Sequence, residues 1–218
     1  MPRASRLDGR PAGTVNLIGG RLCLDFVNSV GARRFSPSRK MSIREEKLND
    51  YLDLLAWGRH VGALTNADAE TLAHGSRQRP KEATAVFHCA IRLREAMYHI
   101  CHARLSHKQP NEADLFVLNE ELRLARGAEQ LVFEKARFDW QWSTPGSALD
   151  RVLWQVARSA ADLLTQDDLS RLRQCGGDDC GWIFLDTSRN RGRRWCDMRD
   201  CGNVAKVRRF RRRLSAAH

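Results

Sequence analysis

Four cysteines near the C-terminus have the residue type and spacing of a metal site. Cys175, Cys180, Cys196 and Cys201 form the pattern C-x4-C-x15-C-x4-C, which is two close pairs separated by a span long enough for a β-hairpin. Two such pairs supply the four soft donors that tetrahedral Zn²⁺ requires. Because four protein ligands leave no open coordination position, we expect one structural zinc ion and no catalysis by this metal.

Positive charge is concentrated around and beyond the last two of these cysteines. Residues 189–213 carry eleven lysines and arginines against two aspartates, so they supply +9 of the chain's net charge of +11. A solvated surface normally mixes both signs, because like charges repel one another. This density predicts a polyanionic partner, with nucleic acid (DNA or RNA) as the first choice and an acidic protein as the alternative. A membrane surface is not expected, since no long basic helix carries a broad aromatic face.

The positions of these polar side chains suggest two different roles. Those that follow Cys201 on a helix are expected to neutralise phosphates, which sets affinity and salt dependence. Those around Cys196 have the chemistry to reach base edges, since Arg pairs with guanine and Asn with adenine. For Asn203 the alternative is a helix cap or a contact that orients the neighbouring metal ligand. The predicted phosphate-binding residues are Lys206, Arg208, Arg209, Arg211 and Arg212, and the predicted base-reading residues are Arg193, Arg194, Arg199 and Asn203.

The elements that must position these residues can be outlined from the pattern. Alternating large side chains predict a strand over residues 181–185, and residues 193–195 are expected to return beside it after a polar turn. Cys201 is expected to open a helix on which Val207, Phe210 and Leu214 form an apolar seam that packs on this hairpin. A module of this size buries too little apolar surface to fold without its metal.

The rest of the chain has a helical pattern and a composition that permits a real core, with 42% hydrophobic residues in 218. Apolar residues recur every three or four positions in residues 81–107, and Thr65 with Asp68 resembles a helix capping pattern. Residues 131–142 alternate apolar and polar side chains instead, which predicts two short antiparallel strands. We therefore expect a mainly α (α+β) protein with three parts. These are a flexible N-terminus in residues 1–15, a helical domain with a small β-hairpin in residues 16–166, and a treble-clef-like zinc finger with a β-hairpin and an arginine-rich C-terminal helix in residues 167–218.

Cysteine use and hydropathy indicate the compartment. The chain has no apolar run of about 18 residues and no apolar stretch near its N-terminus of the kind found in secretory signals. Its seven cysteines are an odd number, and a reducing compartment would keep four of them available as ligands. We expect a cytoplasmic protein.

The helical domain offers one candidate ligand site. Asp25 and Asn28 lie three residues apart inside an apolar segment, where they would meet Arg94 and line a pocket for a small-molecule effector. The alternative is a structural ion pair whose groups are all satisfied. The sequence contains no nucleophile elbow, glycine-rich phosphate loop or hydrolytic metal motif, so we do not expect an enzyme.

The chain also resembles a known family along almost its whole length. The finger segment carries F-x-D-x-S at residues 184–188 and R-W-C-x-M-x-x-C-G-N at residues 194–203, and it resembles the CGNR-type zinc finger. Residues 19–29, 93–99 and 157–165 are similar to the ABATE domain that precedes this finger in bacterial proteins described as stress-induced transcription regulators. The resemblance implies a DNA-binding regulator whose N-terminal domain senses a ligand or forms a homodimer.

One position departs from the family pattern. The arginine that closes the CGNR signature is Val204 in this sequence. If that arginine contacts phosphate in relatives, this chain lacks one such contact, while its four predicted zinc ligands are all present.

Overall fold

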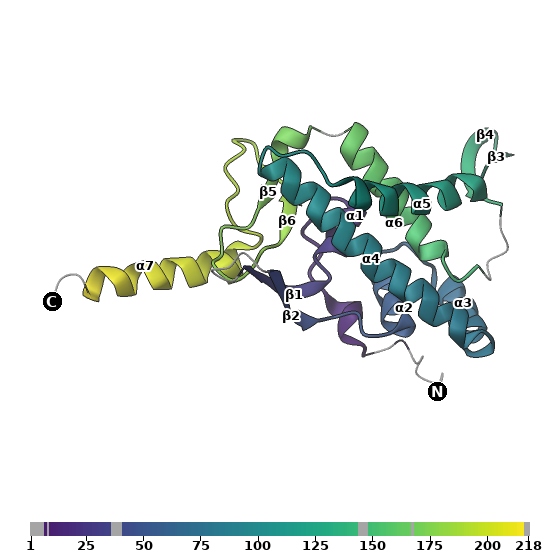
Figure 1. Ribbon diagram of the computed structural model, residues 1–218, viewed down its shortest axis with the longest axis horizontal. Helices are drawn as coiled ribbons and strands as arrows, with labels where there is room; N and C mark the ends of the chain where they lie inside the picture. Colours follow the sequence, from purple (N-terminus) through teal and green to yellow (C-terminus); the bar gives the residue numbers. More distant parts are fainter. Residues whose placement is uncertain (1–6, 8, 36–40, 144–147, 167, 216–218) are drawn as a thin grey trace.

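The computed structural model describes residues 7, 9–35, 41–143, 148–166 and 168–215. These residues form a helical body from which one C-terminal helix projects (Figure 1), which confirms the mainly α fold class. The α-helices described are α1 Leu22–Val27, α2 Tyr51–His60, α3 Asn66–Gln78, α4 Pro80–Leu105, α5 Glu112–Ala128, α6 Arg151–Thr165 and α7 Asn203–Ser215. Short turns of other helix types are η1 Pro11–Thr14, η2 Leu169–Arg171 and the π-type turn η3 Met198–Gly202.

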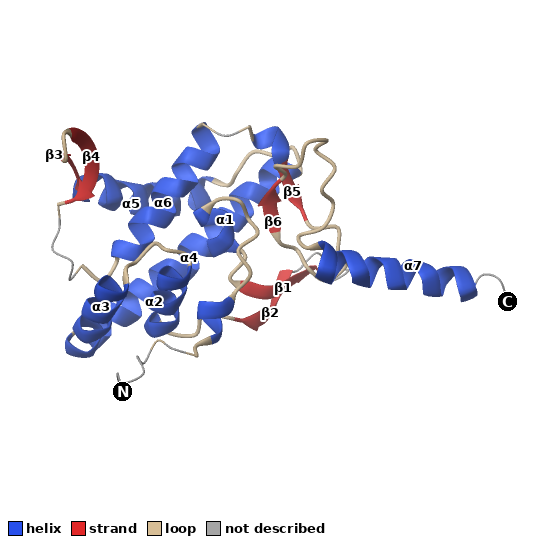
Figure 2. Cartoon of the chain, turned by 180° about the vertical axis from the view of Figure 1, so that it is seen from behind, coloured by secondary structure: helices blue, strands red, loops and turns tan. Residues whose placement is uncertain are grey.

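Six strands in the described part of the chain pair only as antiparallel hairpins. Two hairpins lie near the start of α7 and the third lies at the opposite end of the molecule (Figure 2). The pairs are β1 Val30–Phe35 with β2 Met41–Glu46, β3 Glu129–Glu134 with β4 Arg137–Trp142, and β5 Leu172–Gln174 with β6 Ile183–Leu185.

Local caps explain where several helices begin. Thr65 and Asp68 form the predicted capping box at the start of α3, in which each side chain accepts a hydrogen bond from the backbone of the other residue. Asp50 accepts from Asp53 N to open α2, and Asn111 accepts from Ala113 N to open α5.

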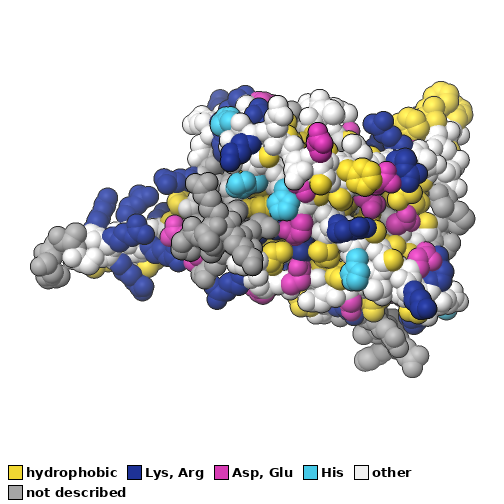
Figure 3. Space-filling view, viewed as in Figure 1, with side chains coloured by type: hydrophobic (Ala, Val, Ile, Leu, Met, Phe, Trp, Pro, Cys, Tyr) yellow, Lys and Arg dark blue, Asp and Glu magenta, His cyan; other side chains and the backbone are white. Residues whose placement is uncertain are grey.

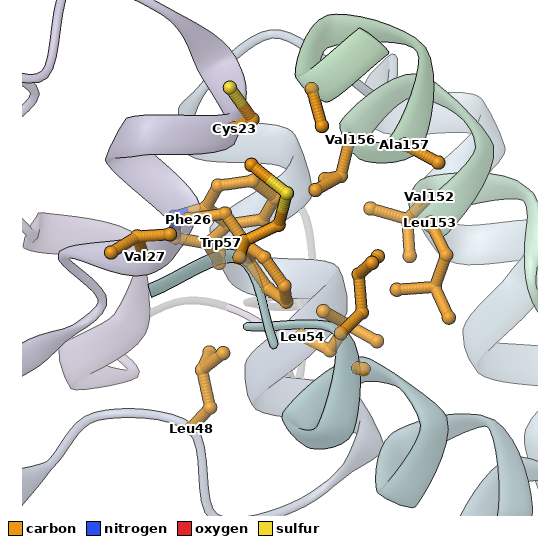
Figure 4. Packing of buried hydrophobic residues seen from close by; sticks show 14 of the residues in the cluster. Cys23, Phe26, Val27, Leu48, Leu54, Trp57, Val152, Leu153, Val156 and Ala157 are labelled. Carbon is orange, nitrogen blue, oxygen red and sulfur yellow. The ribbon is translucent and has the colours of Figure 1, made fainter. Parts of the chain in front are cut away.

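The core lies where α1, α2, α4 and α6 meet. Phe26 of α1 contacts Trp57 of α2 with ring centroids 4.9 Å apart, and Val152 and Val156 of α6 close the cluster beside them (Figure 4). Cys23 is buried in the same core, and burial raises the pKa of its thiol to about 12. It therefore behaves as a small apolar side chain at neutral pH.

The N-terminal boundary differs from the expectation. Leu7 and Ala12 are buried, and Arg10 donates to Asp50 at 2.8 Å and to Asp53 at 2.6 Å. Ordered contacts with α2 therefore begin well before residue 16, while residues 1–6 and 8 lie outside the described part.

The β1–β2 hairpin was not expected from the sequence, which shows only a polar stretch there. Arg33 on β1 is 2% exposed, and its guanidinium forms two hydrogen bonds with Glu95 of α4 and lies 4.1 Å from the centroid of the Tyr98 ring. A buried arginine of this kind needs both its charge and its donors satisfied. The hairpin is thus joined to the helical body by a buried paired charge as well as by the buried side chain of Val30.

The β5–β6 hairpin is the main correction within the finger. The predicted strand is present as β6, but it pairs with β5, in the register Leu172↔Leu185, and the segment 193–195 is irregular. Leu172, Ile183 and Leu185 are buried in the same apolar cluster as α1 and α4. The strands of the finger therefore complete the core of the helical body.

Candidate metal centre and nucleic-acid interface

The four predicted ligands converge. One ligand atom from each of Cys175, Cys180, Cys196 and Cys201 lies within 4.8 Å of the others, and the Sγ atoms of Cys180 and Cys201 lie 3.6 Å and 3.4 Å from that of Cys196. Sulfurs in a tetrahedral zinc site with bonds of about 2.3 Å are about 3.8 Å apart. The donor set and its spacing fit one Zn²⁺ ion.

Hydrogen bonds within the cluster favour the thiolate at Cys175, while the pKa values of Cys180, Cys196 and Cys201 are raised by these contacts and by burial. Hydrogen bonds from the thiols of Cys180 and Cys196, together with the backbone N–H groups of Cys196 and Gly177, lower the pKa of Cys175 far below that of a free thiol. The N–H of Cys196 lies 3.2 Å from Cys175 Sγ. A Cβ on Gly177 would lie 3.2 Å from Cys201 Sγ, so the first knuckle has little room for a side chain at this position.

Each ligand pair sits on a distinct local structure. Cys175 directly follows β5, and Cys180 precedes β6. Cys201 lies inside η3, whose start is capped by Asp197 accepting from Arg199 N at 2.7 Å. The helix that Cys201 was expected to open begins two residues later, at Asn203.

The buried carboxylate of Asp186 organises the segment between the knuckles. It accepts hydrogen bonds from Ser188 N at 2.9 Å, Ser188 Oγ at 2.5 Å and Arg193 N at 2.9 Å. Burial raises the pKa of Asp186, but these hydrogen bonds outweigh that effect and lower it overall. The F-x-D-x-S motif therefore ties the return segment to β6.

Arg193 has a structural position instead of the predicted base-reading one. Its guanidinium donates to the carbonyls of Ile18, Trp195 and Cys196 at 3.3, 3.2 and 2.6 Å, and it stacks on the Phe184 ring with a centroid distance of 4.2 Å. Backbone carbonyls thus engage the Nε and Nη2 donors of Arg193, which it cannot at the same time offer to a base edge.

Helix α7 meets the finger with a cationic face, which corrects the expected packing of its apolar seam. Arg208 donates to Asp178 at 2.6 Å and lies 3.6 Å from Asp179, both on the first knuckle. The seam of Val207, Phe210 and Leu214 is 48%, 64% and 52% exposed. Apart from the contacts at its base, α7 extends into solvent, and none of its residues is buried.

A cavity of about 410 Å³ lies between α7 and the metal cluster. Its walls combine the rings of Trp182 and Trp195 with side chains of both charges, among them Asp178, Asp179 and Asp200. The cations that line it are Arg194, Arg208, Arg209 and Arg212.

The remaining predicted nucleic-acid residues are exposed. Asn203 donates to the carbonyl of Arg199 in the turn that contains Cys201, at 3.0 Å, and Arg194 lies 5.2 Å from the Trp195 ring centroid. Within the part of the chain that the structure describes, the other cations form no ion pair, and α7 brings four of them together (Figure 3). Those four are Lys206, Arg209, Arg211 and Arg212, and Arg199 lies in the turn before them.

The three predicted pocket residues have separate structural contacts. Asp25 accepts from Gly19 N at 2.8 Å, and Asn28 bonds the backbone of Ile183. Arg94 is fully buried and donates to Glu46 at 2.6 and 2.7 Å and to Glu95 at 2.9 Å. Each of the three side chains therefore has hydrogen-bond partners within the fold, as expected for a structural role. The contacts do not bring the three side chains together into one ligand pocket.

Comparison with known families decides what kind of protein carries this site. Residues 20–167 match the family model ABATE, whose description is "Putative stress-induced transcription regulator". The chain belongs to the ABATE family. Residues 171–214 of this ABATE chain match the CGNR zinc finger, so its four clustered cysteines are the ligands of one structural zinc ion. A search of curated proteins finds no match.

The two matched segments of this ABATE protein share one core, as the burial of β5 and β6 shows. Two residues that join them were not predicted from the sequence: Arg33, whose backbone N–H donates to the Cys180 carbonyl at 2.9 Å, and Gly181, which lies against Arg33. Of these residues, only Gly181 could have been noticed in the sequence, because glycine is the residue type that most easily adopts a positive φ such as the 70° found there. None of the helices in the described ranges is both long and apolar enough to cross a membrane.

Proposed function

We propose that this ABATE protein is a DNA-binding transcription regulator that presents α7 to the phosphate backbone. The observation that carries the proposal is the projection of α7 from the body with exposed, unpaired cations along its described length (Figure 1). Such a helix places several positive charges within reach of one polyanion, where counterion release favours binding. The family description supports the regulatory part.

The finger supports this role by fixing the base of the helix. Zinc bound by the four cysteines would fix the position of η3, and Arg208 forms ion pairs with Asp178 and Asp179. We assign phosphate contacts to Lys206, Arg209, Arg211 and Arg212, because these residues have exposed side chains on one helix. Arg194 and Arg199 remain the proposed base-reading residues, since both are exposed beside the start of α7.

The N-terminal domain would then supply the regulatory input, by sensing a ligand or by dimerising. One cavity supports ligand sensing, with a volume of about 360 Å³ where the β3–β4 hairpin meets α6. Trp140 and Trp142 line it together with Arg21 and Arg158. The proposal requires no catalytic group and places the protein in the cytoplasm, with DNA.

Selection from a random double-stranded DNA pool tests the proposal. The zinc-loaded protein is compared with a Lys206→Ala, Arg209→Ala, Arg212→Ala variant and with a control that loses the same charge from the exposed residues Arg104, Lys108 and Arg126. We expect an enriched motif that the α7 variant loses and the control keeps. The slope of log affinity against log salt should fall by about 2.7 in the α7 variant, since each phosphate contact contributes about 0.9.

Other results would favour the alternatives. Salt-sensitive binding that competitor RNA abolishes would indicate an RNA-binding protein. Equal behaviour of the α7 variant and the control, or no binding to any nucleic acid, would reject the proposal and favour an acidic protein partner.

A further inference from the structure

The β3–β4 hairpin carries an exposed apolar face at the end of the molecule opposite α7 (Figures 2 and 3). Leu131 pairs with Trp140 and Phe133 pairs with Phe138, and residues directly opposite one another in a hairpin share a face. These four side chains are 55%, 54%, 62% and 69% exposed, in that order. Together they form what we call the aromatic face.

The aromatic face is internally ordered and its four side chains are each more than half exposed, although Trp140 also lines the cavity beside α6. The rings of Phe133 and Phe138 contact each other with centroids 4.9 Å apart, and the hairpin is anchored at its base by Trp142 against Trp154 at 5.4 Å. A two-stranded hairpin with both faces in water is at best marginally stable. The hairpin is therefore expected to gain stability when an apolar partner covers this face.

The size of the face is suited to an interface. Large apolar side chains bury about 150–250 Å² each, so the exposed fractions above correspond to on the order of 450 Å² per molecule. Two such faces in contact would remove on the order of 900 Å² from water, which is close to the lower limit of about 1,000 Å² for a specific interface. Contacts at the edges of the hairpin would add to this area.

The charge distribution favours a second copy of the same chain as the occupant. The chain's charge is +11, so two copies repel one another unless they meet far from the basic segment 189–213. The charged residues Glu134, Arg137 and Asp139 belong to the opposite face by strand alternation, and Glu129, on the same side as the aromatic face but at the base of the hairpin, is paired with Arg158. Contact through this face would place the two α7 helices at the outer ends (Figure 1).

We propose that the aromatic face of the β3–β4 hairpin is the surface through which two copies of this protein form a two-fold symmetric dimer. Identical faces meet across a two-fold axis, so Phe133 and Phe138 of each copy contact the same residues of the other. This inference deepens the dimerising role in the proposed function by naming its surface. It does not depend on DNA binding and is tested without nucleic acid.

Sedimentation velocity of the full-length, zinc-loaded protein over the micromolar range tests the proposal. The hairpin variant Phe133→Ser, Phe138→Ser is compared with Phe116→Ser, Phe210→Ser, which changes two phenylalanines that are 66% and 64% exposed on α5 and α7. We expect wild type and control to dimerise, and the dissociation constant of the hairpin variant to rise by at least about tenfold, because central aromatic residues dominate interface energetics.

A second measurement guards against local unfolding of the hairpin in the variant. Hydrogen exchange of wild-type amides in residues 129–142 should slow as protein concentration rises, because dimerisation protects the strands. The proposal is overturned if wild type is a monomer throughout, if the hairpin variant dimerises as well as wild type, if the control alone loses the dimer, or if protection does not depend on concentration.

Discussion

The side-chain amide of Asn28 pairs with the backbone of Ile183 in both directions. Asn28 Nδ2 donates to the Ile183 carbonyl at 2.8 Å, and Asn28 Oδ1 accepts from Ile183 N at 3.0 Å. Asn28 follows the last residue of α1, and Ile183 begins the zinc-finger strand β6. A single asparagine thus supplies the donor and the acceptor that a neighbouring strand would otherwise provide.

Replacing Asn28 by Leu should therefore destabilise the protein. Both backbone groups of Ile183 would lose a partner inside the core, at a cost of about 2 kcal/mol or more. Urea denaturation measures the change, with the exposed Asn203→Leu as a control expected to stay within about 0.5 kcal/mol. Equal effects of the two substitutions would show that the Asn28 contact is not structural.

Cys180→Ser should abolish binding of one zinc ion per chain. Loss of the metal would free Cys201 and η3, so α7 should become sensitive to protease. Metal analysis and limited proteolysis measure both effects. Cys89→Ser, outside the cluster, should retain one zinc ion, and retention of full zinc by Cys180→Ser would contradict the assignment.

Val204→Arg should increase DNA affinity if the proposed function is correct. Val204 is 46% exposed and lines the cavity beside Arg209, so a new guanidinium there would lie near the phosphate that we assign to Arg209. The slope of log affinity against log salt should steepen by about 0.9. The control Leu124→Arg adds the same charge on α5. An equal increase in DNA affinity in that variant would show that a charge at position 204 has no specific effect.

Stability should depend on pH through Glu95. Burial raises the pKa of Glu95, but Arg33 and Arg94 lower it more, so its folded pKa lies below the ordinary value of 4.5. A depressed pKa means that the stabilisation is complete above about pH 4.5 and is lost as the pH falls through the folded pKa. Glu95→Gln should therefore be less stable than wild type at neutral pH. The difference in free energy of unfolding between the two proteins, measured by urea denaturation, should become smaller below pH 4.5. A gap that does not change with pH would show that the charge of Glu95 is unimportant.

Gly181→Ala should weaken the junction between β1 and the first zinc knuckle. Its φ is +70°, and a Cβ would lie 2.7 Å from Arg33 Cβ and 2.8 Å from Arg33 O. Strain in the left-handed region alone costs about 1 kcal/mol. Gly127→Ala, which meets no atom within 4 Å inside α5, should instead stabilise the helix by up to about 1 kcal/mol in thermal or urea unfolding. Stabilisation by both substitutions would contradict the close contact.

The main helices could be predicted because their apolar periodicity and caps are local signals. The β3–β4 hairpin followed in the same way from alternation in residues 131–142. The cysteine spacing was sufficient to predict the metal cluster, because four thiols at that spacing have few other uses.

Features that depend on charge pairs across the chain could not be predicted. The side chain of Arg33 on β1 can be buried because Glu95, sixty-two positions away, neutralises its charge. The pattern of apolar residues along the sequence carries no information about such a distant pair. The inward face of α7 was predicted wrongly for a similar reason. Its apolar seam suggested packing on the hairpin, but the helix contacts the first knuckle through Arg208 and Asp178, and the seam is exposed to solvent.

The position of β6 in the core also sets a constraint on synthesis. Ile183 and Leu185 reach the core only after more than four fifths of the 218 residues have been translated. Domains that emerge early from a ribosome commonly fold before the rest of the chain appears. Here the apolar residues of α1 that contact β6 would stay exposed to solvent until β6 has been synthesised. A chain released by a ribosome that stalls before residue 183 would therefore expose these residues to proteases and chaperones.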